Sequence, residues 1–264
     1  MPEIFGFDCY SPREIAERVE SVGVTKANLP FIPMVVLGVL AGGFIGLGAL
    51  FSTLVLSDAQ LGFAVARVLA GVVFSLGLIL VVVAGAELFT GNNLLVMACV
   101  ARRITTRKLL LNFVIVYFSN FIGAAGLATI VALSGHPGMA NGNIWRTAVA
   151  IATTKVALPF ADAFFRGVLC NVLVCLAVWT AMAGRGVADK ILAIVFPITA
   201  FVAAGFEHSV ANMYFLPLAI FLHADIGITD VLRNLIPVTL GNLVGGAGMV
   251  GVVYHIIYRR RGAT

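Results

Sequence analysis

Six long apolar stretches limit what this chain can fold into. They run roughly over residues 31–56, 67–88, 109–134, 160–183, 191–222 and 235–258. An α-helix needs about 20 apolar residues to cross a bilayer, whereas the strands of a membrane barrel are shorter and alternate in polarity. Of the 264 residues, 61% are hydrophobic and only 11% are charged, against about 25% charged residues in a soluble domain. The sequence therefore predicts an all-α membrane protein with six transmembrane helices.

The distribution of Lys and Arg predicts how these helices are oriented. Basic residues gather in the loops after the second and fourth stretches and in the tail over 259–264, whereas the loop after the first stretch has none. Lys and Arg accumulate on the cytoplasmic side of membrane proteins, so we expect both termini in the cytoplasm. The net charge of +5 then reflects membrane topology and gives no indication of a nucleic-acid partner.

Three regions follow from this pattern. Residues 1–28 precede the first stretch, and Ser11-Pro12 followed by REIAERVESV is typical of a capped amphipathic helix at the cytoplasmic membrane surface. A helix exposed to solvent is the alternative interpretation. Residues 29–258 are expected to form a transmembrane pore domain, and residues 259–264 a basic cytoplasmic tail.

Four sequence elements occur twice, in the same order. Residues 84–92 and 204–212 read AGAELFTGN and AGFEHSVAN; Lys26 begins KANLPF and Lys155 begins KVALPF; GVL occurs at 38–40 and 167–169; residues 120–126 and 242–248 read NFIGAAG and NLVGGAG. These pairs predict two repeats, about 26–134 and 155–258. Because each repeat holds three spans, an odd number, the second enters the membrane from the opposite side, which predicts inverted repeats.

The repeated nonapeptides interrupt the second and fifth spans. Residues 88–93 are poor helix formers, and residues 191–222 are too long for one unbroken crossing. We therefore expect helix breaks near the midplane at 88–93 and 204–208. Irregular backbone at this depth is tolerated only inside protein or beside a water-filled cavity, so paired breaks indicate a transport pathway.

Several polar residues lie close to the expected breaks. His208 is the one histidine predicted near the midplane, where it could exchange a proton or remain neutral and bond to a backbone carbonyl. Glu87 and Glu207 could belong to the pathway or accept N–H groups freed by the breaks. Lys155, expected in an external loop, could attract anions or serve topology alone, and Asn171 is a further polar group within a span.

Other residues are expected to shape the breaks and the pore. Asn120 and Asn242 are expected to form hydrogen bonds between helices, beside small residues that let helices approach closely. Phe74, Leu78 and Phe201 could form an apolar constriction or belong to ordinary core packing. Five residues are candidate anchors of the broken segments: Glu87, Gly91, Asn92, Gly205 and Asn212.

The motifs also resemble those of a known family. GAELFTGNN at 85–93, CNVLVCLAVW at 170–179, GFEHSVANM at 205–213 and IPVTLGNLVGG at 236–246 are similar to signatures of the formate/nitrite transporter family, and the resemblance runs from about residue 26 to 258. It implies an aquaporin-like fold and a homopentamer with one pore per protomer, in the bacterial cytoplasmic (inner) membrane. The implied cargo is a small weak-acid anion, formate in particular, with nitrite and hydrosulfide as alternatives, and passage is linked to protons.

The resemblance also implies roles for individual residues. Thr90 and His208 would form the central anion site, where His208 supplies or relays a proton. Lys155 would provide positive charge from the periplasmic side and pair with Glu207 and Asn171. The implied apolar constrictions are formed by Phe74, Leu78, Leu88, Phe89 and Phe201.

The resemblance implies a transporter without catalytic residues, metal or cofactor. A neutral-solute channel of the aquaporin type is one alternative, although its Asn-Pro-Ala signature is absent. A haem-binding oxidoreductase or anchor subunit would need paired histidines within the spans, and a non-transporting subunit would carry no flux.

Overall fold

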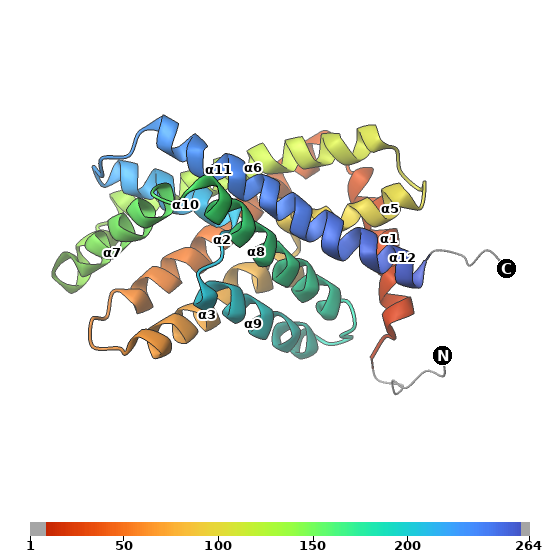
Figure 1. The fold of residues 1–264 in the computed structure, drawn as a ribbon, viewed down its shortest axis with the longest axis horizontal. Coiled ribbons are helices and arrows are strands. Elements are labelled where there is room, and N and C mark those ends of the chain that lie inside the picture. The colour runs from red at the N-terminus through yellow and green to blue at the C-terminus, as the bar shows by residue number, and fades with distance from the viewer. Residues whose placement is uncertain (1–8, 260–264) are drawn as a thin grey trace.

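The computed structural model describes residues 9–259, and throughout this range the chain is helical or in short connections (Figure 1). Six helical segments are long and apolar enough to cross a membrane, which confirms the predicted all-α fold. These are α2 (Phe31–Leu56), α3 with its π-helical end (Phe63–Gly85), α6 (Thr106–Leu133), α8 (Phe160–Ala181), α9 (Val187–Ala204) and the segment Ile228–Tyr258. The last segment consists of α11 (Ile228–Leu243), a π-helical stretch (Val244–Val252) and α12 (Val253–Tyr258).

Shorter helices complete the bundle. After the break in the second span the chain forms α4 (Phe89–Asn92), a 3-10 turn (Asn93–Leu95) and α5 (Val96–Val100). After the break in the fifth span it forms α10 (Ser209–Phe221). Helix α2 packs against α3 and α6, while α8 packs against α9 and α11. The two short segments therefore begin inside a frame of long helices.

The break in the second span lies earlier than predicted. Helix α3 continues into a π-helical turn that ends at Gly85, whose φ is +86°, and residues 86–88 are then extended. Residues 89–92, which we expected to be irregular, are helical. Their asparagine does not disrupt the helix, because the Asn92 side chain donates a hydrogen bond to Glu87 instead of competing for the helix backbone.

The break in the fifth span lies at the predicted place. Helix α9 ends at Gly205, which has a left-handed φ of +74°, and α10 begins after His208. The amides of Gly205 and Phe206 donate to the carbonyls of Val202 and Phe201, which closes the end of α9 in the manner of a glycine C-cap.

Close helix approach depends on the first glycine of each N-x-x-G segment, and in the second segment also on Gly246, where an added methyl group would lie 2.2 Å from the Asn171 amide nitrogen. A methyl group added at Gly123 would lie 1.9 Å from the Val39 carbonyl oxygen, and one at Gly245 would lie 2.2 Å from the Val168 carbonyl oxygen. At Gly126, the last glycine of the first segment, an added methyl group would meet nothing within 4 Å. The predicted small-residue contacts are thus confirmed at the first glycine of each segment.

Helix α1 (Pro12–Ala27) confirms the predicted capped helix. The Ser11 hydroxyl accepts from the Glu14 amide, and the Glu14 carboxylate accepts from the Ser11 amide. The Ser11 amide and hydroxyl both donate to the Glu14 carboxylate, which lowers the pKa of the Glu14 carboxyl. Residues on one face, including Ile15 and Val19, are buried, because α1 packs on α5 and α12 at one end of the bundle. Residues 1–8 and most of the predicted tail, 260–264, lie outside the described residues.

The predicted external loop before the fourth span is largely helical. Helix α7 (Met139–Val156) occupies most of it and contains a left-handed turn at residues 140–142. Lys155 therefore stands in the last turn of a helix and not in a loop. The segment has no apolar stretch long enough to span a membrane, so the search for long apolar stretches predicted no helix here.

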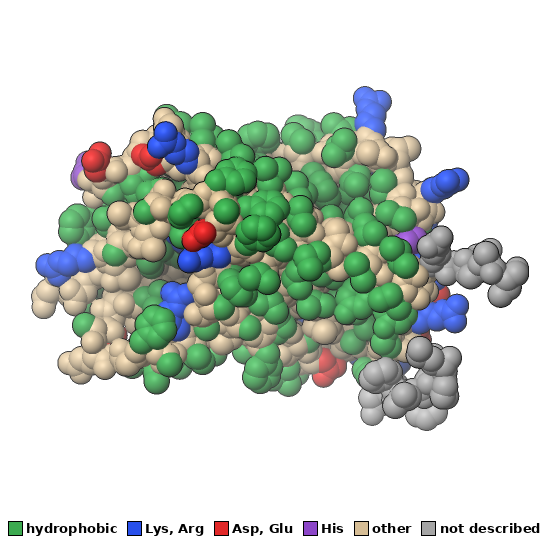
Figure 2. Space-filling view, in the orientation of Figure 1, with side chains coloured by type: hydrophobic (Ala, Val, Ile, Leu, Met, Phe, Trp, Pro, Cys, Tyr) green, Lys and Arg blue, Asp and Glu red, His purple; other side chains and the backbone are tan. Residues whose placement is uncertain are grey.

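The surface agrees with a membrane environment. Figure 2 shows hydrophobic side chains over the middle of this face, with most Lys and Arg towards its ends. Large apolar side chains such as Phe63, Phe118 and Phe196 are well exposed. Such a surface is far more apolar than that of a soluble monomer, as expected where lipid or another protomer covers it.

Candidate functional site

The two helix breaks bring Thr90 and His208 together. Thr90 lies in the first turn of α4, and His208 is the N-cap residue of α10. The Thr90 Oγ1 and His208 Nε2 atoms are 3.0 Å apart, and both side chains are buried. Two residues that are 118 positions apart in sequence thus form one polar contact inside an apolar bundle.

The hydrogen bonds of His208 assign its tautomer. The Nδ1 atom accepts a hydrogen bond from the Ala211 amide at 3.1 Å, so it carries no proton in this geometry. In a neutral ring the proton then lies on Nε2 and is donated to the Thr90 oxygen. The Thr90 hydroxyl hydrogen therefore remains free to be donated to another acceptor.

Two asparagines hold the broken backbone segments. Asn120 accepts from the Phe89 amide and donates to the carbonyls of Gly38 and Glu87. Asn242 accepts from the Ser209 amide and donates to the matching carbonyls of Gly167 and Glu207. The expected hydrogen bonds between helices are thus present, and they satisfy backbone groups that the breaks leave unpaired.

A Lys–Glu–Asn–Asn set supports the first break. The Lys26 amine lies 2.9 Å from a Glu87 carboxylate oxygen and 3.0 Å from Asn92 Oδ1. The Asn92 amide donates to both Glu87 and Asn112. The Glu87 side chain thus accepts hydrogen bonds from other side chains. One of the two sequence interpretations had it accept from backbone N–H groups freed by the break, and this is not observed.

A second set repeats this arrangement at the other break. The Lys155 amine lies 2.9 Å from a Glu207 carboxylate oxygen. Asn212 donates to Glu207 and to Asn234, and Asn234 donates to the Lys155 carbonyl. The inverted orientation of the two repeats stays a prediction, and this match of contacts supports it.

Sequence reasoning missed Lys26, Asn112 and Asn234 as parts of the site. The pair KANLPF and KVALPF already placed Lys26 in register with Lys155. That signal was sufficient to predict a second Lys–Glu pair once Glu87 and Glu207 were matched.

The implied pairing of Lys155 with Asn171 is corrected. The Asn171 amide donates to the carbonyl oxygens of Thr90 and Asn242 and to Asn93 Oδ1. Asn171 lies in the middle of α8, fully buried at the level of the Thr90 segment. It therefore joins the two broken segments to α8, while Lys155 pairs with Glu207.

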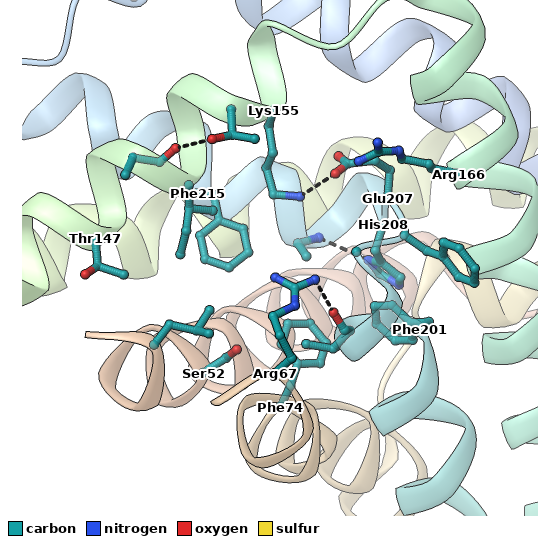
Figure 3. Close-up of a pocket in the computed structure, with 18 residues that line it drawn as sticks. Ser52, Arg67, Phe74, Thr147, Lys155, Arg166, Phe201, Glu207, His208 and Phe215 are labelled. Atoms are coloured by element: carbon teal, nitrogen blue, oxygen red, sulfur yellow. Dashed lines mark hydrogen bonds and ion pairs between the residues drawn. The ribbon is translucent and has the colours of Figure 1, made fainter. Parts of the chain in front are cut away.

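A cavity of about 460 Å³ lies on one side of the Thr90–His208 pair. We name it the Lys155 vestibule; its lining includes Lys155, Glu207 and His208 (Figure 3). The rings of Phe74 and Phe201, whose centroids are 5.5 Å apart in an edge-to-face arrangement, border it on the inner side. That these two phenylalanines form a constriction stays a prediction, and their contact at the cavity wall supports it.

A second cavity, of about 630 Å³, lies beside the first break. We name it the Lys26 vestibule; it is lined by Lys26, Glu87, Leu78 and Leu88 and covered by residues of α1. Leu78 and Leu88 thus belong to this second vestibule. Phe89 lines neither vestibule, and its ring packs against the aromatic rings of Phe113 and Tyr117; its place in a constriction stays a prediction.

The remaining predicted anchor residues have distinct positions. Gly205 forms the left-handed end of α9, and Asn92 and Asn212 bond to the two glutamates. Gly91 lies in α4, where an added methyl group would meet only Val178 at 3.6 Å. The functional roles of the site residues stay predictions.

This arrangement defines a class of protein. Helices that cross the membrane, two broken helices that meet at a buried polar pair, and a vestibule on either side are the features of a membrane channel or transporter. Comparisons with known proteins then give the family. The model of the family described as Formate/nitrite transporter matches residues 13–256, so the chain belongs to the formate/nitrite transporter family.

Curated relatives and solved structures agree with this assignment. The chain is 38% identical to the formate channel FocA of Haemophilus influenzae, with 92% of each chain covered. It is 40% identical to the formate channel BtFdhC of Bacillus thuringiensis, with 96% and 97% covered. A solved pentameric formate channel with formate bound matches with a TM-score of 0.80 and 36% identity, over 86% of this chain and 97% of that one. An FNT family ion channel matches with a TM-score of 0.85 and 30% identity, over 92% and 98%.

Proposed function

We propose that this protein transports formate across the bacterial cytoplasmic membrane, as a homopentamer with one pathway per protomer and no catalytic step. Relatives with 38% and 40% identity are named formate channels, and a structural neighbour is a pentameric formate channel with formate bound. The positive-inside distribution of Lys and Arg supports cytoplasmic termini. The Lys155 vestibule then faces outward and the Lys26 vestibule faces the cytoplasm.

The observation that carries the proposal is the buried hydrogen bond between Thr90 and His208. A bare anion loses its hydration when it passes apolar rings, at a cost of many kcal/mol. The neutral acid avoids most of that cost. A pathway with polar vestibules and an apolar centre therefore favours a weak acid, which can be an anion in water and neutral in the constriction.

The passage follows from these contacts. Formate enters the Lys155 vestibule as an anion, and the free hydroxyl hydrogen of Thr90 is donated to one carboxylate oxygen. The low-dielectric surroundings favour the neutral form, so formate takes up a proton that comes from the external solution. The neutral acid passes Leu78 and Leu88 and releases the proton to water in the Lys26 vestibule. His208 relays the proton only when its Nδ1 atom releases the Ala211 amide and is protonated.

Flux into liposomes that hold the purified protein tests this proposal. We expect formate influx to exceed chloride influx and to rise as the external solution becomes more acidic, because acid supplies the transported proton. Nitrite and hydrosulfide are measured beside formate, since each is also a small weak-acid anion. Equal chloride flux, or no flux of any anion, would overturn the proposal.

Two variants separate the roles of the central pair. Thr90→Val keeps the shape and removes the hydroxyl; we expect about tenfold lower formate flux, as for the loss of one hydrogen bond of about 1.4 kcal/mol, and recovery in Thr90→Ser. His208→Asn should keep a pore with altered pH dependence. An unaltered pH dependence in His208→Asn would exclude the proton relay.

A further inference from the structure

The positive charge of the Lys155 vestibule does not come from Lys155 itself. Its amine lies 2.9 Å from Glu207, so the two charges largely cancel for an approaching ion. The cavity lining holds two further cations, Arg67 and Arg166. Neither forms an ion pair with a carboxylate among residues 9–259. The net charge of this lining is therefore set by two arginines.

The opposite vestibule carries no such excess. Its lining includes one cation, Lys26, and one carboxylate, Glu87, and these two are paired at 2.9 Å. The matched Lys–Glu pairs thus make the two breaks alike, while the arginines make the two vestibules different. Of the two linings, only that of the Lys155 vestibule carries a net positive charge.

Arg67 is held in a fixed position at the inner end of the Lys155 vestibule. Its Nε atom donates to the Ala203 carbonyl at 3.0 Å and its Nη2 atom to the Val202 carbonyl at 2.7 Å, which are among the last carbonyls of α9. The Nη1 atom has no partner among the described residues. Figure 3 shows the Arg67 side chain reaching into the same cavity as the Lys155 amine.

The position of Arg67 also relates it to the constriction. It precedes Phe74 by two helical turns on α3, and the carbonyls it binds directly follow Phe201. Gly205 leaves room for the guanidinium, because a methyl group added there would lie 3.0 Å from Nη2. The charge thus lies next to the backbone that directly follows Phe201, in the cavity that both rings line.

We propose that Arg67 is an anion-binding residue that captures small monovalent oxyanions, carboxylates above all, at the outer side of the Phe74–Phe201 constriction. The inference rests on the proposed function and deepens it. A half-buried, rigidly held guanidinium with a free N–H suits a planar carboxylate, and a cleft with one sign of charge raises the local concentration of the opposite ion. Arg166 adds to the attraction, and Lys155 serves to hold Glu207.

The test is the concentration dependence of formate influx into liposomes, at about 0.01 M and 0.15 M ionic strength. We compare the wild type with Arg67→Gln and Arg67→Lys. Arg233→Gln is the matched control: it removes the same charge near Asn234, which bonds to the Lys155 carbonyl, but Arg233 does not line the vestibule. We expect Arg67→Gln to raise the half-saturating formate concentration roughly tenfold at low salt, at the lower end of the range for charged clefts.

Three further results are expected from this series. The maximal flux of Arg67→Gln stays near that of the wild type, Arg67→Lys recovers at least half of the lost affinity, and the salt dependence weakens in Arg67→Gln because screening acts on the removed charge. A purely structural role would instead lower the maximal flux equally in Arg67→Gln and Arg67→Lys, with no change in salt dependence. That result would overturn the inference.

The two proposals fail in different ways. If the wild type carries no formate, the proposed function fails. If the wild type carries formate with the same half-saturating concentration and salt dependence as Arg67→Gln, the proposed function stands and the assignment of Arg67 is wrong.

Discussion

At the scale of single residues, two buried amides stabilise what would otherwise be the weakest part of the fold. Asn120 and Asn242 are fully buried, and each joins one amide and two carbonyls of the main chain. A backbone group left unpaired in an apolar interior costs about 1–3 kcal/mol. The asparagines thus make it possible to stop and restart a helix where no water is available.

Asn120→Ala should lower stability without changing the apolar surface. It leaves the Phe89 amide and the carbonyls of Gly38 and Glu87 without their partner, so we expect a loss of about 3 kcal/mol or more and a lower melting temperature in detergent. Thr129→Ala on the same helix is the control, because its hydroxyl bonds only to the exposed Ala125 carbonyl. Equal melting temperatures of the two variants would contradict this role.

At the scale of helices, contact distance separates two glycines of one motif. Gly123→Ala places a methyl group 1.9 Å from the Val39 carbonyl, whereas Gly126→Ala meets nothing within 4 Å. We expect Gly123→Ala to force α2 and α6 apart at a cost of about 3 kcal/mol. Gly126→Ala should be neutral or slightly stabilising, because alanine is the better helix former.

The yield of folded, heat-resistant protein in detergent measures this difference. Gly123→Ala should give little such protein, and Gly126→Ala as much as the wild type. If both substitutions were tolerated equally, the close packing of α2 on α6 would not limit stability.

The two helix breaks also show what the sequence can reveal about elements. The break after Gly205 was predictable, because glycine, a long span and a midplane histidine coincide there. The first break was placed too late, because Gly91 and Asn92 are weak helix formers. In the folded chain Asn92 bonds to Glu87, and the chain turns at Gly85, the counterpart of Gly205 in the repeat. Matching the glycines of the two nonapeptides would have given the correct position.

Partners distant in sequence could not be predicted in the same way. The six spans follow from apolar length alone, and the fold class was therefore predictable. The bond of Asn171 to the Thr90 carbonyl depends on how deeply α8 lies beside α4, which no local pattern encodes. The same holds for Arg67. The sequence shows only that this arginine lies near the end of a span, whereas its partners Val202 and Ala203 belong to another helix.

At the scale of the whole molecule, an ion pair joins the first helix, α1, to Arg259, the residue that follows α12. The buried Glu20 carboxylate of α1 accepts from Arg259, just beyond α12, at 2.7 Å, and Arg103 lies 3.8 Å away. Through this contact α1 is held over the Lys26 vestibule, which residues 19, 22, 23, 25 and 26 of α1 help to line. We therefore expect access to that vestibule to depend on how firmly α1 is docked.

Glu20→Gln should loosen α1. It removes the charge of a buried ion pair, which is costly when the partner remains, so we expect amide hydrogen exchange in α1 to become roughly tenfold faster, equivalent to about 1.4 kcal/mol. Glu17→Gln is the control: Glu17 also pairs with Arg259, but its side chain is 54% exposed, and exposed pairs contribute little. Equal exchange rates in the two variants would show that α1 is held by its apolar face alone.

The matched Lys–Glu–Asn–Asn sets have a consequence for how this chain is connected. Every member of the first set comes from residues 26–112, and every member of the second comes from residues 155–234. A cut in the connection over 135–138 would leave each set within one half of the chain, while Asn171 and Arg67 would still bond across the halves. The connection over 135–138 then serves chiefly to ensure that the two repeats are made in equal amounts. The proposed transport site, with Thr90 from one half and His208 from the other, lies in physical terms at an interface between two subunits joined in one chain.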